Sequence, residues 1–273
     1  MSFPALTAAQ VAQYERDGFL TLPGLLSADE VAILRSEIER VSKIHTDEVK
    51  RESEDGSPKI MLALHQEGRA VSSAPMAALV RLPRTLGAAQ AVLGDDDLYM
   101  HHTKCNLKAS IEGSAWPWHQ DFGSWRLDGI KLPDMTTLMV SLDTAEEING
   151  CLYFLPGSHR EGRHDAFFDT STAYHLYAVP HEVTRERIRQ YGPPVAIKSK
   201  PGDAVIFDCN LLHASGHNLS ADNRWQIFLC YNTCANRPDD VPDARPSYVR
   251  GTDWDQPLRV IADDALLPEG ALP

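Results

Sequence analysis

A histidine and an aspartate two residues apart, His119 and Asp121, lie in the aromatic stretch that runs from Trp116 to Trp125. Side chains of an extended strand alternate between its two faces, so both groups would point into one cavity. One imidazole nitrogen and one carboxylate oxygen make up two thirds of a 2-His-1-carboxylate triad, which binds Fe(II) and leaves coordination positions open. Apolar walls for this cavity are expected from four aromatic residues: Trp116, Trp118, Phe122 and Trp125.

The third ligand should come from a later strand that folds back beside this pair. Two histidines are candidates, His213 and His217. His213 directly follows an apolar segment with the character of a strand, so it can point inward from ordered structure. His217 lies beyond Ser215 and Gly216 in a polar turn. We therefore expect His213 to complete the triad, although a hydrogen-bonded core histidine is the simpler alternative for a residue at a strand end.

Arg224 begins an apolar strand that continues to Tyr231. A buried guanidinium is costly unless it meets an anion, and its planar fork suits a carboxylate. An acidic side chain of the protein itself would be a purely structural partner. In the company of three metal ligands, the carboxylate of a co-substrate is the favoured interpretation.

The elements that would position these residues follow from periodicity and turn signals. Helices are expected at about 7–17, 27–45 and 75–93, where capping residues or prolines precede apolar residues at helical spacing. Residues 46–59 are polar and acidic and predict an exposed loop. Strands are expected at 19–22, 98–108, 135–142, 151–155, 195–198, 204–207 and 225–231. The alternation in 98–108 places a polar set on one face: His102, Lys104, Asn106 and Lys108.

Helices first, then short strands separated by Gly and Pro turns, indicate an α+β chain whose core is a β-sandwich or jelly roll. We expect a single domain over residues 1–273, with N-terminal helices at about 7–93, a jelly-roll core at about 98–232 and a surface tail at 233–273. The charged segment 159–194, with a helix at about 181–191, is expected to be a lid or a binding loop.

Charge and composition restrict the partners. The net charge of −12 and the lack of a basic stripe argue against nucleic acid and against an anionic membrane. The N-terminus lacks the basic start and apolar run of a signal peptide, and no segment approaches the roughly 18 apolar residues of a membrane helix. The five cysteines are never spaced C-x-x-C, which predicts reduced thiols and a cytoplasmic protein. A small-molecule substrate is expected, and the oligomeric state, monomer or homodimer, stays open.

The remaining histidines are interpreted without metals. His101 and His102 are adjacent, so on a regular strand they would face opposite sides and one of them at most would enter the site. Four histidines of the 159–194 segment show no ligand spacing and are expected on the surface or in the lid: His159, His164, His175 and His181.

A series of short motifs resembles the phytanoyl-CoA dioxygenase (PhyH) family, and the resemblance runs over about residues 10–235. The motifs occur in the order of that family: His119-Gln120-Asp121, Asn149-Gly150-Cys151-Leu152, Pro156-Gly157-Ser158-His159, Pro201-Gly202-Asp203, His213-Ala214-Ser215 and Arg224. The stretch around Trp116–Gly129 is similar to the bacterial branch of ectoine hydroxylases and trans-4-proline hydroxylases.

The resemblance implies a double-stranded β-helix, Fe(II), O2, and 2-oxoglutarate as co-substrate. It implies His119, Asp121 and His213 as iron ligands. It also implies Arg224 as the clamp for the distal carboxylate of 2-oxoglutarate, with Ser215 and Asn106 assisting. Ectoine hydroxylases have Gln at the position of His102 and Arg at that of Lys104, and such positions face the co-substrate or the substrate. Aromatic substrate contacts are implied at Trp125 and Phe228.

The expected function is therefore hydroxylation of an unactivated C–H bond in an amino acid or amino-acid derivative, with release of succinate and CO2. The carboxylate ligand Asp121 disfavours the related halogenases, which have Gly or Ala there, and the acidic charge disfavours a CoA thioester as substrate. Alternatives are the same chemistry on a larger natural product or an aminophosphonate, a cupin-like hydrolase or isomerase, and a non-catalytic β-sandwich binding protein.

Overall fold

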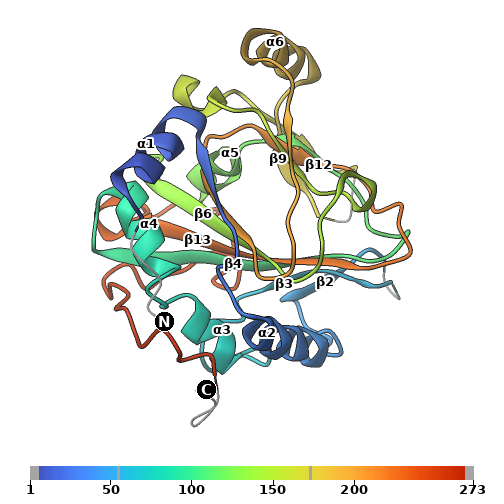
Figure 1. Ribbon diagram of the computed structural model, residues 1–273. Helices are drawn as coiled ribbons and strands as arrows, with labels where there is room; N and C mark the ends of the chain where they lie inside the picture. Colours follow the sequence, from blue (N-terminus) through green and yellow to red (C-terminus); the bar gives the residue numbers. More distant parts are fainter. Residues whose placement is uncertain (1–5, 54–55, 172–173, 268–273) are drawn as a thin grey trace.

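Two antiparallel sheets face each other in a computed structural model that describes residues 6–53, 56–171 and 174–267 (Figure 1). The larger sheet has seven strands in the order β1-β11-β6-β13-β4-β3-β2, and the smaller has six in the order β10-β7-β12-β5-β9-β8. The expected jelly-roll core, in an α+β chain, is thereby confirmed. The strands of the larger sheet are β1 (Phe19–Leu22), β2 (Val49–Arg51), β3 (Pro58–Leu62), β4 (Leu98–Lys108), β6 (Met135–Ser141), β11 (Ala204–Asp208) and β13 (Arg224–Thr233).

The smaller sheet carries shorter strands. They are β5 (Trp116–His119), β7 (Leu152–Phe154), β8 (Phe167–Asp169), β9 (Leu176–Ala178), β10 (Val195–Ile197) and β12 (His213–Ser215). The α-helices are α1 (Ala8–Asp17), α2 (Ala28–Val41), α3 (Ala74–Leu79), α4 (Leu86–Leu93), α5 (Asp121–Trp125) and α6 (His181–Tyr191). Single 3-10 turns are η1 (Arg126–Asp128), η2 (Glu147–Asn149), η3 (Ser158–Glu161) and η4 (Cys234–Asn236).

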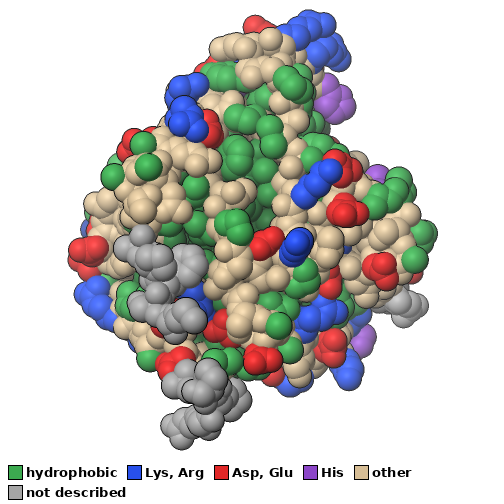
Figure 2. Space-filling view, viewed as in Figure 1, with side chains coloured by type: hydrophobic (Ala, Val, Ile, Leu, Met, Phe, Trp, Pro, Cys, Tyr) green, Lys and Arg blue, Asp and Glu red, His purple; other side chains and the backbone are tan. Residues whose placement is uncertain are grey.

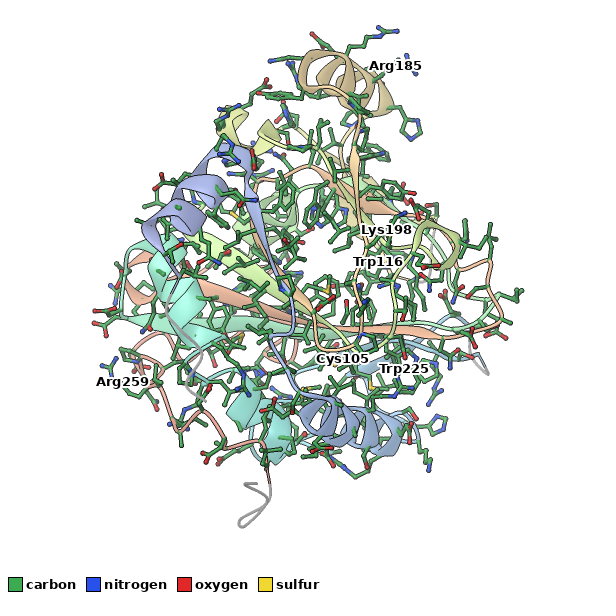
Figure 3. The ribbon with its side chains drawn as sticks, viewed as in Figure 1. Cys105, Trp116, Arg185, Lys198, Trp225 and Arg259 are labelled. Carbon is green, nitrogen blue, oxygen red and sulfur yellow. The ribbon has the colours of Figure 1, made fainter. Side chains whose placement is uncertain are left out.

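The N-terminal helices cover the outer face of the larger sheet. Thr7 and Ser27 each close a capping box, with Gln10 and Glu30 respectively, so α1 and α2 begin where the sequence predicts. The apolar faces of α2, α3 and α4 pack on outward-facing residues of β4 and β13 in one buried cluster. Figure 3 shows Trp225 on this outer side near α2, where the guanidinium of Arg35 lies 4.9 Å from its ring. The helices therefore keep one face of the sheet dry and leave the other for the site.

One expectation about an irregular segment is wrong, and the structure adds detail to two others. Residues 46–59 contain β2 and the start of β3, because their backbone pairs with each other and with β4. The 159–194 segment contains a hairpin, β8–β9, besides the expected helix α6. The tail after residue 232 does not simply follow the surface, because Arg245 and Val249 reach buried partners near the site.

Within the described residues, no helix is long and apolar enough to cross a membrane. On the face drawn in Figure 2, basic side chains are interspersed with acidic ones, and hydrophobic side chains gather beneath α6.

Candidate active site

The two histidine ligands lie opposite each other on neighbouring strands of the smaller sheet. β5 ends at His119 and β12 begins at His213, and the antiparallel register pairs these two residues directly. Their rings lie 4.0 Å apart between centroids. Asp121 does not belong to the strand: the chain turns after His119, and Asp121 is the first residue of α5. The extended backbone of Gln120 between them still brings Asp121 to the same side as His119.

Three ligand atoms converge in the way that a metal ion requires. Oδ1 of Asp121 lies 3.9 Å from Nε2 of His119 and 3.9 Å from Nε2 of His213. One ligand atom from each residue lies within 4.8 Å of the other two. His217 is exposed and lies outside this cluster, whereas His213, the expected candidate, belongs to it. Two imidazoles and one carboxylate are the donors expected around non-haem Fe(II).

Neighbouring groups orient all three ligands. The Nδ1 atoms of His119 and His213 donate to the carbonyls of Pro117 and Leu211, at 2.8 and 2.9 Å, so each Nε2 lone pair faces the metal position. Burial lowers the pKa of both imidazoles, which keeps them neutral and able to bind a metal. The hydroxyl of Thr137 donates to Oδ2 of Asp121 at 3.2 Å and leaves Oδ1 for the ion.

The aromatic walls differ from expectation. Trp116 lines the cavity and stacks near His119, and Figure 3 shows it pointing into the space between the sheets. Trp118 instead packs toward α6, while Phe122 and Trp125 belong to another buried cluster. For Phe122 and Trp125 the reason is local, because β5 ends at His119 and the helical period of α5 replaces strand alternation beyond it.

Arg224 lies in the same cavity as the ligands and is 2% exposed. Its Nη2 donates to the carbonyl of Gly150 at 2.9 Å, and its Nη1 donates to Oε1 of Gln226. Nε is buried with no hydrogen-bond partner, and no ion pair of Arg224 with an acidic side chain occurs within the described residues. Burial lowers the pKa of Arg224 only to about 10, so the guanidinium stays charged at neutral pH. The purely structural explanation, an internal acidic partner, is therefore wrong for this arginine.

A glycine is required beside Arg224. Gly150 has a φ of +76°, and a Cβ atom built on it would lie 2.5 Å from the carbonyl oxygen of Gly216 and 3.0 Å from Nζ of Lys108. A side chain there would push apart the turn whose carbonyl accepts from Arg224. The Asn149-Gly150 motif is thus explained by close packing behind the guanidinium.

Most of the other predicted contact residues line the same cavity. Asn106, Ser215, Lys104 and Phe228 all face it, and the buried Oδ1 of Asn106 has no partner. A buried polar atom without a partner, beside the three metal-ligand residues, is a group that a polar ligand would satisfy. Three lining or adjoining residues were missed at the sequence level: Leu152, Gln226 and Lys108.

Lys108 is 2% exposed and donates to the carbonyl of Gly216. Burial, reinforced by the charges of Arg224 and Lys59, lowers its pKa to about 6. The strand alternation that placed Lys108 on the face of Lys104 and Asn106 was the signal that could have identified it.

His102 and Trp125 are placed outside the lining of this cavity. Nδ1 of His102 donates to the carbonyl of Val249, and Trp125 packs edge-on against His101 at 5.4 Å. A register shift between β4 and β13 leaves His101 without an opposite residue, so it is a β-bulge. The bulge turns His101 toward Trp125 and Asp128. Its ring centroid lies 6.5 Å from that of His102, so the expectation of opposite faces is wrong for this pair.

A C-terminal strap, which we define as residues 239–251, ties the ligand-bearing helix to β4. Arg245 donates to both carboxylate oxygens of Asp128 in η1, just after α5. The backbone N–H of Gly251 donates to the carbonyl of His101. Val249 joins the apolar cluster that contains Trp116. The strap thus links Asp121, through α5 and η1, to the bulge of β4.

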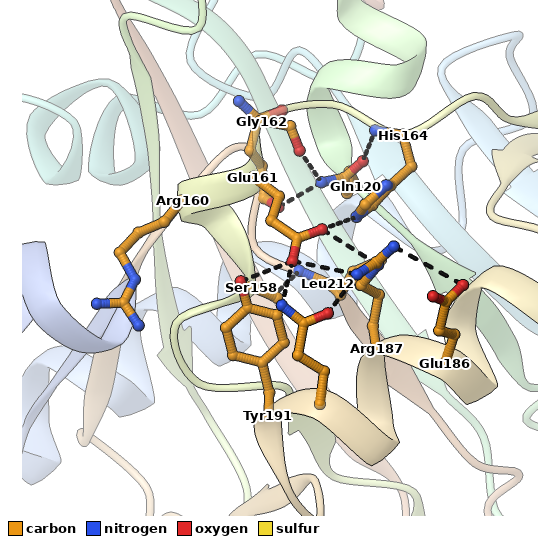
Figure 4. Close-up of polar contacts among 12 residues, drawn as sticks. Gln120, Ser158, Arg160, Glu161, Gly162, His164, Glu186, Arg187, Tyr191 and Leu212 are labelled. Carbon is orange, nitrogen blue, oxygen red and sulfur yellow. Dashed lines mark hydrogen bonds and ion pairs between the residues drawn. The ribbon is translucent and has the colours of Figure 1, made fainter.

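A polar network fastens the other flank of the site (Figure 4). Gln120, between the two ligands of β5 and α5, donates to the carbonyl of Gly162 at 2.8 Å and accepts from the N–H of His164 at 2.7 Å. Glu161 accepts from Tyr191 at 2.8 Å and pairs with Arg187 at 3.1 Å. This network joins α6 and η3 to the residue that separates His119 from Asp121.

Comparison with known proteins identifies a family and several similar proteins. The family pattern of phytanoyl-CoA dioxygenase (PhyH) matches residues 14–225. The chain is 35% identical over 246 residues to the ectoine dioxygenase of Bordetella bronchiseptica, covering 85% of this chain and 77% of that protein. It is 33% identical over 276 residues to the L-proline trans-4-hydroxylase of Streptomyces griseoviridis, covering 96% of this chain and 98% of that protein.

The fold is similar to that of a solved relative. The crystal structure of EctD from S. alaskensis with 2-oxoglutarate and 5-hydroxyectoine matches with a TM-score of 0.81 at 30% identity, and the match covers 94% of this chain and 88% of that one.

Proposed function

The chain belongs to the phytanoyl-CoA dioxygenase family and is an Fe(II)- and 2-oxoglutarate-dependent dioxygenase, and on this basis we propose that it hydroxylates a free amino acid or a small amino-acid derivative. The observation that carries the proposal is one cavity that holds three metal-ligand atoms within 4.8 Å and a buried guanidinium without an acidic partner. The named substrates of the relatives, ectoine and L-proline, support the substrate class.

The iron, with O2 and 2-oxoglutarate, supplies the oxidising chemistry that inserts oxygen into a C–H bond and releases succinate and CO2. His119, Asp121 and His213 would hold it, and Thr137 would keep the carboxylate in the orientation that binding needs. Trp116 and Phe228 exclude water from the cavity because their rings form its apolar walls.

The residue roles are part of the proposal. We assign Arg224, Ser215, Asn106 and His102 to 2-oxoglutarate. The buried Nε of Arg224, a donor without a partner, supports this assignment most directly, whereas His102 lies outside the cavity lining and has no such support. We assign Lys104, Phe228 and Trp125 to the substrate, with direct support from the cavity lining for the first two.

The proposal also covers organisation and location. We propose one catalytic domain over residues 1–273 that functions in the cytoplasm as a monomer or homodimer. The cytoplasmic location is supported by five cysteines that are all unpaired.

Succinate release tests this function. Enzyme loaded with Fe(II) and 2-oxoglutarate should release succinate under O2 when offered an amino-acid-type substrate. Asp121→Ala should abolish the release, and His217→Ala, at an exposed histidine outside the cluster, should leave it unchanged. Full activity of Asp121→Ala would contradict the proposed site.

A further inference from the structure

One ammonium group occupies the aromatic part of the cavity. Nζ of Lys104 lies 4.9 Å from the ring centre of Trp116 and 5.1 Å from that of Phe228. Phe228 is the residue opposite Lys104 in the register of β4 with β13, whereas Trp116 comes from β5 in the facing sheet. The lysine therefore reaches across the cavity and fills the space between two aromatic rings, one from each sheet.

This ammonium has no anion beside it. No hydrogen bond or ion pair of Lys104 occurs within residues 6–53, 56–171 and 174–267. Its neighbours differ in this respect: Lys59 pairs with Glu52 at 3.2 Å, and Lys108 donates to the carbonyl of Gly216. Lys104 faces the cavity with its charge balanced only by the electron-rich faces of two rings.

Charge in the loaded site would remain unbalanced at Lys104. Asp121 is the one acidic residue among those that line the described cavity, and it belongs to the metal cluster. A ferrous ion and Arg224 together carry three positive charges, and Asp121 with dianionic 2-oxoglutarate carries three negative ones. The charge of Lys104 is then left without compensation in a partly desolvated site, which is unfavourable unless the substrate supplies an anion.

A cationic group of a substrate would find no partner at the same place. Aromatic faces are a usual site for substrate ammonium or amidinium groups, but here the protein's own ammonium occupies the faces of Trp116 and Phe228. Among the described lining residues, no carboxylate remains outside the metal cluster. The cavity therefore offers a cation to the substrate, and its described lining holds no second carboxylate with which a cationic group of the substrate could pair.

We infer that the substrate is a carboxylic acid without a free cationic group, such as an N-acylated amino acid, and that Lys104 binds its carboxylate. The inference rests on the proposed function, because it takes the substrate to lie in this cavity beside the iron. It separates this chain from a hydroxylase of free amino acids, in which both charges of a zwitterion need partners.

A panel of charge-matched compounds tests the inference. Each amino acid is offered in three forms: the N-acetyl acid, the free zwitterion and the methyl ester with a free amine. Substrate-dependent succinate release and anaerobic calorimetry on the complex with Fe(II) and 2-oxoglutarate are measured for each form. N-acetyl acids, N-acetyl-L-proline included, should exceed the free amino acids at least about tenfold in kcat/KM or affinity, the scale of one ion-paired hydrogen bond, and the esters should be inactive.

Substitutions at Lys104 give the second arm. Lys104→Met should raise the KM for the N-acetyl acid about 10- to 100-fold with a much smaller change in kcat, and Lys104→Arg should restore most of the affinity. Lys104→Ala vacates the space between the two rings and should let the cationic ester bind. Lys198→Met, at an exposed lysine paired with Glu147, is the matched control and should change nothing.

The outcomes distinguish failure of the inference about the substrate from failure of the proposed function. Preference for the free amino acid over its N-acetyl form, an unchanged KM in Lys104→Met, or no binding of any carboxylate while 2-oxoglutarate still binds would each overturn the inference alone. Loss of Fe(II)-dependent 2-oxoglutarate binding in the wild-type enzyme would overturn the proposed function instead.

Discussion

Replacing Arg224 by methionine removes the group proposed to hold the distal carboxylate of 2-oxoglutarate. A guanidinium has five N–H donors, and the protein engages two of them, through Gln226 and the carbonyl of Gly150. Three donors remain, including the buried Nε that has no partner in the described structure. These suffice for a bidentate contact with one carboxylate.

The expected loss follows from two charge-assisted hydrogen bonds. Each contributes about 1.5–3 kcal/mol, so the pair contributes about 3 kcal/mol or more. Since about 1.4 kcal/mol corresponds to a factor of ten, Arg224→Met should weaken 2-oxoglutarate binding at least about 100-fold. Arg224→Lys keeps the charge without the planar fork, so its affinity for 2-oxoglutarate should lie between those of the wild type and Arg224→Met.

Anaerobic calorimetry on the Fe(II) enzyme measures this directly, and 2-oxobutyrate is the matched ligand because it lacks the distal carboxylate. Arg224→Met should weaken binding of 2-oxoglutarate and leave that of 2-oxobutyrate nearly unchanged. An equal loss for both ligands would mean that Arg224 supports the cavity instead of binding the carboxylate. Unchanged 2-oxoglutarate affinity in a folded variant would refute the reasoning altogether.

Three further outcomes are expected. Burial lowers the pKa of Lys108 to about 6, and a dianion bound nearby should raise that pKa because it favours the charged ammonium. Binding of 2-oxoglutarate at about pH 8 should therefore take up protons, as measured by calorimetry in two buffers, and Lys108→Met should abolish the uptake. Burial raises the pKa of Asp208 to about 6, above its value in the unfolded chain, so the free energy of unfolding falls as the pH rises through about 6. Asp208→Asn removes this loss and should add about 2 kcal/mol to the free energy of unfolding in urea near pH 7.5 and almost nothing near pH 4. Arg245→Met leaves the fully buried Asp128 unpaired and should cost about 3 kcal/mol of unfolding free energy, whereas Arg259→Met, in an exposed pair with Asp97, should change it by less than about 0.5 kcal/mol; equal losses would contradict the role of the strap.

Short sequence signals predicted the features that depend on neighbouring residues in the chain. The capping boxes at Thr7 and Ser27 located α1 and α2, and the position of His213 after an apolar strand distinguished it from His217. The ligand set was within reach of the sequence because its spacing and strand positions carry the geometry.

Features that depend on pairing with distant chain segments were not predictable in this way. The polar composition of residues 46–59 concealed β2 and β3, which exist because β4 offers them a partner. The bulge at His101 changes which faces its neighbours occupy, and a single inserted residue leaves no trace in the alternation. The contact of Arg245 with Asp128 joins residues 117 positions apart, and no periodic pattern in the sequence predicts it.

The strand order of the larger sheet also bears on how the chain becomes an enzyme during synthesis. β13, which carries Arg224, lies between β6 and β4, so these two earlier strands present open edges until residues 224–233 have left the ribosome. More of the chain must be synthesised between β1 and its partner, because the neighbour of β1 in the sheet is β11. A nascent chain of this topology has long-range pairings to complete and exposed strand edges to protect in the meantime. Its yield in a cell should therefore depend on translation speed and chaperone supply more than that of a helical protein of equal length.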